Sequence, residues 1–148
     1  MAVNELTERQ YCTFYLDGHF LGIGVKEVQE VLKYQYMTEV PLADSVVAGL
    51  INLRGQIVTA LDLRKVMGLG PRQGKQPMNI VVRSDDGPLS LLVDEIGDVV
   101  EVEQDNFEDP PETLEVSFRH LIKGVYKLQE KLMLVLDLDR AVFSLVEA

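Results

Sequence analysis

An internal repeat constrains the fold of this 148-residue chain more than any other feature. Residues 49–64 align without a gap to residues 124–139, a shift of 75 positions, and a Gly, the apolar positions and a Leu-Asp-Leu triplet coincide. A weaker match, at a shift of 68, places residues 25–31 on residues 93–99. Similarity at a near-constant offset indicates duplicated supersecondary units. Each half of the chain is therefore expected to fold as one copy of the same unit.

The repeated unit has the pattern of β-strands. Residues 11–16 and 19–24 flank Asp17-Gly18, a pair that accepts the positive φ of a two-residue hairpin turn. The counterpart in the second half is a strand at 79–84, a turn at 85–88 and a strand at 89–93.

A second hairpin is expected in each half. The segment Asn52-Leu53-Arg54-Gly55 fits a type I turn, with Asn first and Gly last, between strands at 49–53 and 56–63. The repeat places the equivalent later strand at 132–138.

Helices are expected to be short and few. Residues 25–32 have apolar side chains at helical spacing, although their β-branched residues also suit a strand. Residues 63–69 can add one or two helical turns, and 140–146 a terminal helix. The Gly- and Pro-containing stretches at 68–74 and 109–112 are predicted to be a linker between the copies and a loop.

Two copies of about five short strands, each too small for a deep core, are expected to close into small barrels that pack together. The predicted fold is all-β with a few short helices. It comprises two packed five-stranded barrels within one domain spanning 1–148, the first at about 10–70 and the second at about 76–145. The prediction also allows strands near the termini to be exchanged between the two barrels.

The composition argues against several classes of function. The chain has 24 acidic residues against 14 Lys and Arg, which gives a net charge of −10. This charge argues against binding to nucleic acid and against binding to an anionic membrane surface. With a single Cys12 and no apolar leader with a basic start, an intracellular location is expected. Residues 94–115 hold ten acids and no base, which indicates a solvated face or a docking surface for a basic partner.

No residue cluster indicates a catalytic, cofactor or metal site. Cys12 lies within an alternating strand and is interpreted as a core residue, and neither His19 nor His120 has neighbours typical of a nucleophilic or metal site. Phosphate-binding glycine loops and calcium-loop spacing are both missing from the sequence. Asp62 and Asp137 occupy equivalent repeat positions, where they can be paired general acids and bases or, more simply, turn-capping residues.

The turn at residues 52–55 is the strongest functional candidate. The second copy keeps the surrounding pattern but has Lys127-Leu128-Gln129-Glu130 at this place, so the repeated fold does not require Arg54-Gly55. Arg is enriched at binding hot spots because its planar guanidinium satisfies several acceptors while its stem packs on apolar surface.

Three motifs, in this order and spacing, resemble the signature of the CheW family of bacterial chemotaxis coupling proteins. They are Val28-Gln29-Glu30-Val31, the segment from Gly49 to Val58 containing Asn-Leu-Arg-Gly, and Leu61-Asp62-Leu63-Arg64. The similarity extends over about residues 10–145. It departs at Thr59-Ala60, where the family commonly has Pro before an aliphatic residue.

The resemblance implies two SH3-like barrels and a non-enzymatic adaptor without a cofactor. It implies coupling of the cytoplasmic tip of transmembrane chemoreceptors to the regulatory domain of the histidine kinase CheA, with cytoplasmic protein recruited to the membrane only through these partners. The family's receptor-facing surface maps onto Val28, Glu30, Asn52, Leu53, Arg54 and Gly55. A receptor hairpin is expected to place apolar side chains near Val28 and Leu53, while the kinase-binding residues stay unassigned.

Three alternatives stay open. The same adaptor can serve a twitching-motility or developmental chemosensory pathway. A small enzyme using Asp62, Asp94 or Asp137 requires these carboxylates to converge in one pocket. A module that binds a small ligand requires a concave apolar pocket between the barrels.

Overall fold

The structure is a computed structural model that describes residues 9–146, with side chains through residue 142. The described residues form eleven strands and several short helices. The strands are β1 (Gln10–Leu16), β2 (His19–Gly24), β3 (Val28–Leu32), β4 (Val47–Leu53), β5 (Gln56–Asp62), β6 (Met78–Val82), β7 (Leu89–Val93), β8 (Glu95–Glu101), β9 (Phe107–Glu108), β10 (Ile122–Lys127) and β11 (Leu132–Leu136). The helices are η1 (Val25–Glu27), α2 (Leu63–Val66), η2 (Gln104–Asn106), α3 (Val116–Arg119) and α4 (Leu138–Val146). The predicted all-β class with few short helices is confirmed.

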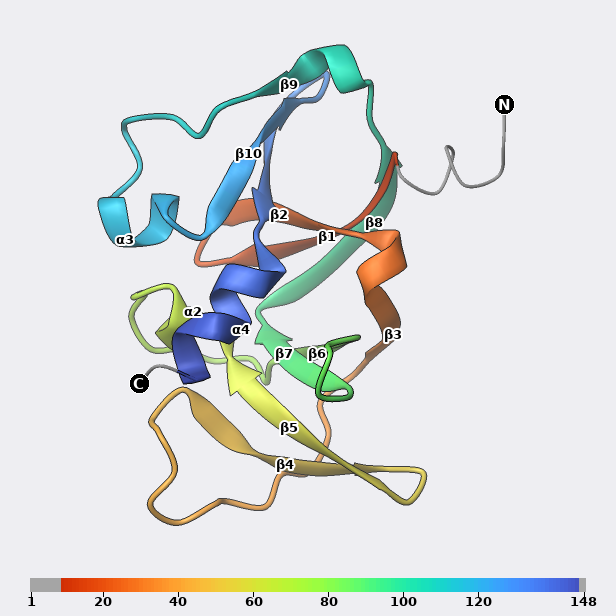
Figure 1. Ribbon diagram of the computed structural model, residues 1–148, viewed down its shortest axis with the longest axis vertical. Helices are drawn as coiled ribbons and strands as arrows, with labels where there is room; N and C mark the ends of the chain where they lie inside the picture. The colour runs from red at the N-terminus through yellow and green to blue at the C-terminus, as the bar shows by residue number, and fades with distance from the viewer. Residues whose placement is uncertain (1–8, 147–148) are drawn as a thin grey trace.

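The strands form two sheets. The six-stranded sheet has the order β8-β1-β2-β11-β10-β9, and the five-stranded sheet has the order β3-β6-β7-β5-β4. Figure 1 shows β4 and β5 at one end of the molecule and β9 and β10 at the other, with α2 and α4 between them.

The repeat is visible in the strand order. Reading β8-β1-β2-β11-β10 beside β3-β6-β7-β5-β4 matches each of these ten strands with its counterpart in the other half and leaves the two-residue β9 unmatched. The parallel pair β2–β11 corresponds to the parallel pair β5–β7, and the remaining neighbours in both sheets are antiparallel. The repeat in the sequence therefore reflects a repeat of topology.

The sheets do not follow the ranges 10–70 and 76–145. The five-stranded sheet takes all its strands from the continuous segment 28–93, whereas the β1–β2 hairpin joins the strands that follow residue 94. The chain thus crosses between sheets at η1 and at Asp94, and residues 68–74 form a loop within the five-stranded part instead of the predicted linker. The sequence pattern assigns residues to strands but does not determine which sheet a hairpin joins.

The β1–β2 hairpin has the predicted turn, with φ of 51° at Asp17 and 80° at Gly18. Residues 25–32, by contrast, are not one helix. Only η1 is helical, and β3 pairs with β6 through contacts such as Val31 with Ile80. The β-branched side chains and the ladder hydrogen bonds prevail over the helical spacing.

The main hydrophobic core lies between the sheets. Phe14 and Leu21 from the six-stranded sheet pack in one cluster with Ile80 and Leu91 from the five-stranded sheet, and all four are almost fully buried. The short helices close this cluster through Leu63, Phe118, Leu138 and Ala141, together with Met67 directly after α2. A smaller cluster lies under the β4–β5 hairpin, at the end that carries the predicted site.

Candidate functional site

The turn between β4 and β5 has a different conformation from the predicted type I turn. Its two central residues are Arg54, with φ of 51°, and Gly55, with φ of 88°, and the strands pair up to Leu53 and Gln56. Positive φ at both central positions is typical of a type I′ hairpin, whose twist matches the flanking strands. Asn52 supports the turn, because its Oδ1 accepts a hydrogen bond of 2.9 Å from the Gly55 amide.

Arg54 and Glu30 form an ion pair at the surface. Arg54 Nη1 donates to Glu30 Oε1 at 3.2 Å, and Nη2 donates to Oε2, so the two planar groups meet side by side. The Arg54 side chain stays 69% exposed, against 23% for Glu30. The hydrogen bond from Arg54 lowers the pKa of Glu30 and raises the pKa of Arg54, so both groups are charged at neutral pH.

Leu53 lies beneath the turn. Its side chain is only 7% exposed and packs with Ile51, Val58 and Val81. Its contribution to the site is the packing that supports the turn, because a side chain buried in this way offers a partner little surface.

Val28 stands apart from the other five residues predicted for the site. It begins β3, is half-buried, and packs against the main core between the sheets. Its carbonyl accepts a hydrogen bond of 2.9 Å from Arg83 Nη1. The structure therefore brings Glu30, Asn52, Arg54 and Gly55 together above Leu53, with Val28 at the start of the same edge strand as Glu30.

An exposed apolar residue that the sequence analysis did not select adjoins the turn. Ile57 is 60% exposed and lies directly opposite Asn52 in the ladder, so the two side chains share a face. Alternation along β5, where the next residue Val58 is buried, was the signal that could have identified it.

Asp62 and Asp94, two of the three carboxylates of the enzyme hypothesis, both face Arg72, at 4.0 and 3.0 Å, whereas Asp137 pairs with Arg140. Asp62 accepts a hydrogen bond from the Arg64 amide at the start of α2, and Asp137 accepts one from the Arg140 amide at the start of α4, both at 3.1 Å. The capping interpretation of these repeat-related residues is confirmed. Asp94 instead binds two arginines, Arg64 and Arg72.

Cys12, His19 and His120 have the packing and hydrogen-bond contacts of residues that support the fold. Burial raises the pKa of the Cys12 thiol, as expected for a packed residue. The His19 ring packs on the Phe118 ring, with 4.7 Å between the ring centroids. The carbonyl of His120 accepts a hydrogen bond from Arg140 Nη1. Within residues 9–146, no group of three or more potential ligand side chains could hold a metal ion.

The acidic segment 94–115 lies largely at the surface. Nine of its ten acids are exposed, and Asp94 is the exception. The prediction of a solvated face is thus confirmed for these nine, whereas docking of a basic partner stays a prediction.

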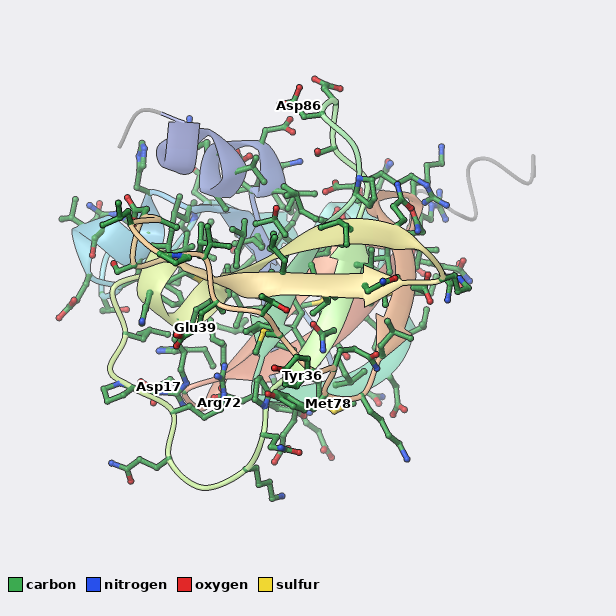
Figure 2. The ribbon with its side chains drawn as sticks, turned by 90° about the horizontal axis from the view of Figure 1, so that it is seen from below. Asp17, Tyr36, Glu39, Arg72, Met78 and Asp86 are labelled. Carbon is green, nitrogen blue, oxygen red and sulfur yellow. The ribbon has the colours of Figure 1, made fainter. Side chains whose placement is uncertain are left out.

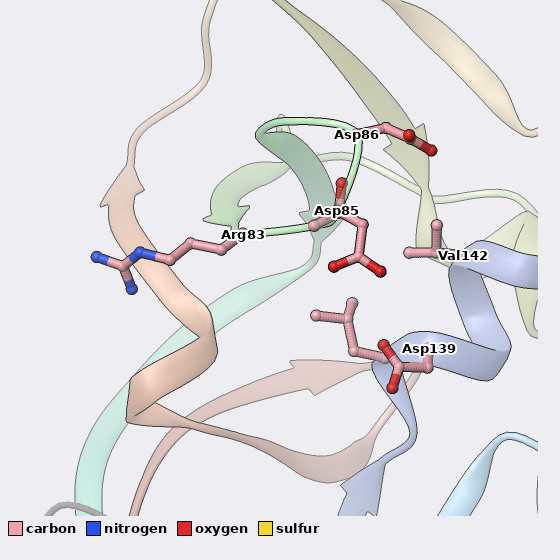
Figure 3. A pocket seen from close by; sticks show the side chains of 7 residues that line it. Arg83, Asp85, Asp86, Asp139 and Val142 are labelled. Atoms are coloured by element: carbon pink, nitrogen blue, oxygen red, sulfur yellow. The ribbon is translucent and has the colours of Figure 1, made fainter.

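Besides a pocket of about 280 Å³ lined by Arg64, Arg72 and Asp94, two pockets among the described residues lie near the junction of the sheets. One, of about 420 Å³, is lined by Arg83, Asp85, Asp139 and Val142 and is seen in Figure 3. The other, of about 360 Å³, includes His19, Leu69, Leu114 and Phe118 and is only partly apolar, whereas small-ligand sites are predominantly apolar.

Comparison with known proteins identifies the family. A family model described as the CheW-like domain matches residues 10–145. The chain belongs to the CheW-like domain family. The resemblance seen in the motifs is therefore confirmed.

Individual proteins of the CheW-like domain family align with nearly the whole chain. Chemotaxis protein CheW of Treponema pallidum is 28% identical over 145 residues, covering 95% of this chain and 85% of the relative. Chemotaxis protein CheW of Thermotoga maritima is 28% identical over 137 residues, covering 93% and 89%. The crystal structure of the scaffolding protein TtCheW from Thermoanaerobacter tengcongensis superposes with a TM-score of 0.77 at 27% identity, covering 87% of this chain and 88% of that one.

Proposed function

We propose that this CheW-like protein is a non-enzymatic adaptor that couples chemoreceptors to the histidine kinase CheA in a chemosensory array. Relatives named chemotaxis protein CheW and a structural neighbour described as a scaffolding protein support this proposal. The observation that carries the receptor-binding part is the exposed Arg54 guanidinium, held at the tip of a hairpin by Glu30.

The site is suited to recognition by contact. Glu30 occupies one edge of the guanidinium, which leaves the remaining N–H groups of Arg54 available to acceptors on a receptor tip. Asn52 and Gly55 fix the turn that presents Arg54, and Leu53 supports the turn from below. Ile57 adds apolar surface on the Asn52 face, and an interface that combines an Arg anchor with apolar neighbours is typical of a hot spot.

Val28 extends the proposed receptor surface toward the junction of the sheets. Its half-buried side chain lies at the start of β3, where the edge strand continues from the crossing at η1. A receptor hairpin that contacts both Val28 and Arg54 therefore has to lie along β3.

Capture of a receptor signalling tip by purified protein tests the proposal. Arg54→Ala is expected to weaken capture at least about fivefold, the equivalent of about 1 kcal/mol, a loss that only a minority of interface residues exceed. Gln129→Ala is the matched control, because Gln129 is exposed at the equivalent position of the second copy. Equal capture by Arg54→Ala and the parent, with both proteins folded, would remove Arg54 from the receptor surface.

The protein is also proposed to bind the kinase, through residues that stay unassigned. It is proposed to be cytoplasmic and to be recruited to receptor arrays by its partners. No helix in residues 9–146 has the length and apolar character needed to span a membrane. Co-purification from the host, followed by identification of the bound kinase and receptor, tests this part.

A related adaptor role in another pathway is the alternative. A relative named Protein PilI from Pseudomonas aeruginosa is 30% identical over 119 residues, covering 79% of this chain and 66% of that protein. A twitching-motility or developmental chemosensory system would use the same surface with a different receptor. The identity of the co-purified receptor distinguishes the two.

A further inference from the structure

Asp94 occupies the point at which the chain passes from one sheet to the other. It is the only residue between β7 of the five-stranded sheet and β8 of the six-stranded sheet. Its Oδ1 accepts hydrogen bonds from Arg64 Nε at 2.9 Å and Arg72 Nε at 3.0 Å. Its Oδ2 accepts hydrogen bonds from Arg64 Nη2 and from the Asp17 amide, both at 2.7 Å. One carboxylate therefore receives four hydrogen bonds.

These bonds join segments from both sheets. Asp17 lies in the β1–β2 turn of the six-stranded sheet, and the Asp94 amide donates to Tyr15 of the same hairpin at 3.1 Å. Arg64 belongs to α2, which follows the five-stranded sheet's β5. Figure 2 shows Asp17 and Arg72 on the same side of the molecule.

The cluster also holds the loop at residues 68–74. Arg64 Nη1 donates to the carbonyls of Gly70, at 2.9 Å, and Pro71, at 3.3 Å, while Arg72 reaches Asp94 from within the loop. The Arg64 side chain is only 11% exposed. Charge-assisted hydrogen bonds in such a setting are strong and directional, and a buried charge without its partner is costly.

The repeat-equivalent positions carry no arginine counterpart of this cluster. At the repeat-equivalent positions, Asp139 stands in place of Arg64 and Lys26 in place of Asp94, so both charges are reversed. Asp139 lines the pocket of about 420 Å³ shown in Figure 3. The arginine cluster is thus a feature of one junction only, and it gives a role to the Arg of the Leu-Asp-Leu-Arg motif.

We propose that Asp94, Arg64 and Arg72 form a polar clamp that fixes the orientation of the two sheets and holds the 68–74 loop against their junction. The apolar core favours contact between the sheets but tolerates small changes in angle, because apolar packing is not directional. Hydrogen bonds from two guanidinium groups to one carboxylate permit far fewer arrangements. Asp94 is a positioning residue, and this role is independent of the proposed adaptor function.

The test compares Asp94→Asn with Asp98→Asn, an exposed acid on β8 that makes the same chemical change. Backbone residual dipolar couplings report the orientation of each sheet, and amide hydrogen exchange reports opening of the loop. In the parent and in Asp98→Asn, couplings from both sheets should fit one rigid body with the angle of the structure. Asp94→Asn should need a changed or separate orientation for each sheet, with exchange in 68–74 faster by at least about tenfold, the equivalent of 1.4 kcal/mol.

A milder variant keeps the test decisive if Asp94→Asn does not fold. Arg72→Lys retains the positive charge and the Arg64–Asp94 pair, and it should accelerate exchange in residues 68–74 while the protein stays folded. Unchanged sheet orientation in folded Asp94→Asn would overturn the clamp. If only Arg72→Lys folds, exchange in 68–74 at the rate of Asp98→Asn would overturn it.

Discussion

Arg54 and Glu30 come from opposite edges of the five-stranded sheet and nevertheless bind each other. Glu30 lies on edge strand β3, Arg54 follows edge strand β4, and three strands separate them in the ladder. In a flat sheet, strands four positions apart lie about 19 Å from each other. The hydrogen bond of 3.2 Å between the two side chains shows that the sheet curls until its edges approach at this end. The predicted site is therefore built where the two edges meet.

This pairing predicts an altered titration of Glu30. The hydrogen bond from Arg54 lowers the pKa of Glu30 below its usual 4.5, so the ion pair should form fully at neutral pH and be lost as acid protonates Glu30. Carbon-detected NMR titration should give a midpoint below 4.5 in the parent and a higher midpoint in Arg54→Ala. The same midpoint in both proteins would show that the pair does not persist in solution.

The turn conformation predicts a cost for any side chain at position 55. Gly55 has φ of 88° and no neighbour within 4 Å of an added Cβ, so strain of the backbone is the only penalty there. Gly55→Ala should destabilise the protein by about 1 kcal/mol in urea unfolding. Gly70 also has open space around an added Cβ but no positive φ, so Gly70→Ala should be nearly neutral. Equal stabilities would argue against the type I′ turn.

Burial separates the roles of Leu53 and Ile57. Leu53→Ala should lower the free energy of unfolding by about 2–5 kcal/mol, because it removes a buried side chain from the cluster under the turn. Ile57→Ala, at a position that is 60% exposed, should change stability by less than about 0.5 kcal/mol. Ile57→Ala should instead weaken receptor capture. A destabilised Ile57→Ala protein beside an unaffected Leu53→Ala protein would contradict this assignment.

The clamp predicts a specific pH dependence of stability. Burial alone would raise the pKa of Asp94, but the hydrogen bonds from Arg64 and the Asp17 amide and the charges of Arg64 and Arg72 outweigh it and lower the pKa below the usual 3.8. The stability from the ionised carboxylate is therefore complete above pH 3.8 and is lost as the pH falls from there through the lower pKa of the folded state.

Urea unfolding of the parent and Asp94→Asn across this range measures the effect. At pH 7 the variant should be less stable by about 2–4 kcal/mol, below the range for a fully buried pair because the Asp94 side chain keeps 19% of its surface. The difference should shrink below pH 3.8. A difference that stays constant down to pH 2 would assign the loss to packing instead of charge.

Several structural features followed directly from local sequence patterns. The Asp17-Gly18 hairpin formed as predicted, because a turn depends on the φ preferences of its own residues. Arg54-Gly55 shows the limit of such reasoning. The segment was recognised as a turn, but the twist of the paired strands selected type I′ and moved its centre to Arg54 and Gly55.

The sequence by itself determined the repeat, the strand-rich class, the exposed turn and the family. Only the tertiary structure decided that the N-terminal hairpin joins the strands beyond residue 94, that Leu53 supports the turn from below, and that Asp94 alone among ten neighbouring acids binds two arginines. Local patterns act over a few residues, through backbone preferences and the alternation of side chains. The pairing of Arg54 with Glu30, or of Asp94 with Arg64, depends on how two sheets curl and meet, which the whole packed core sets at once.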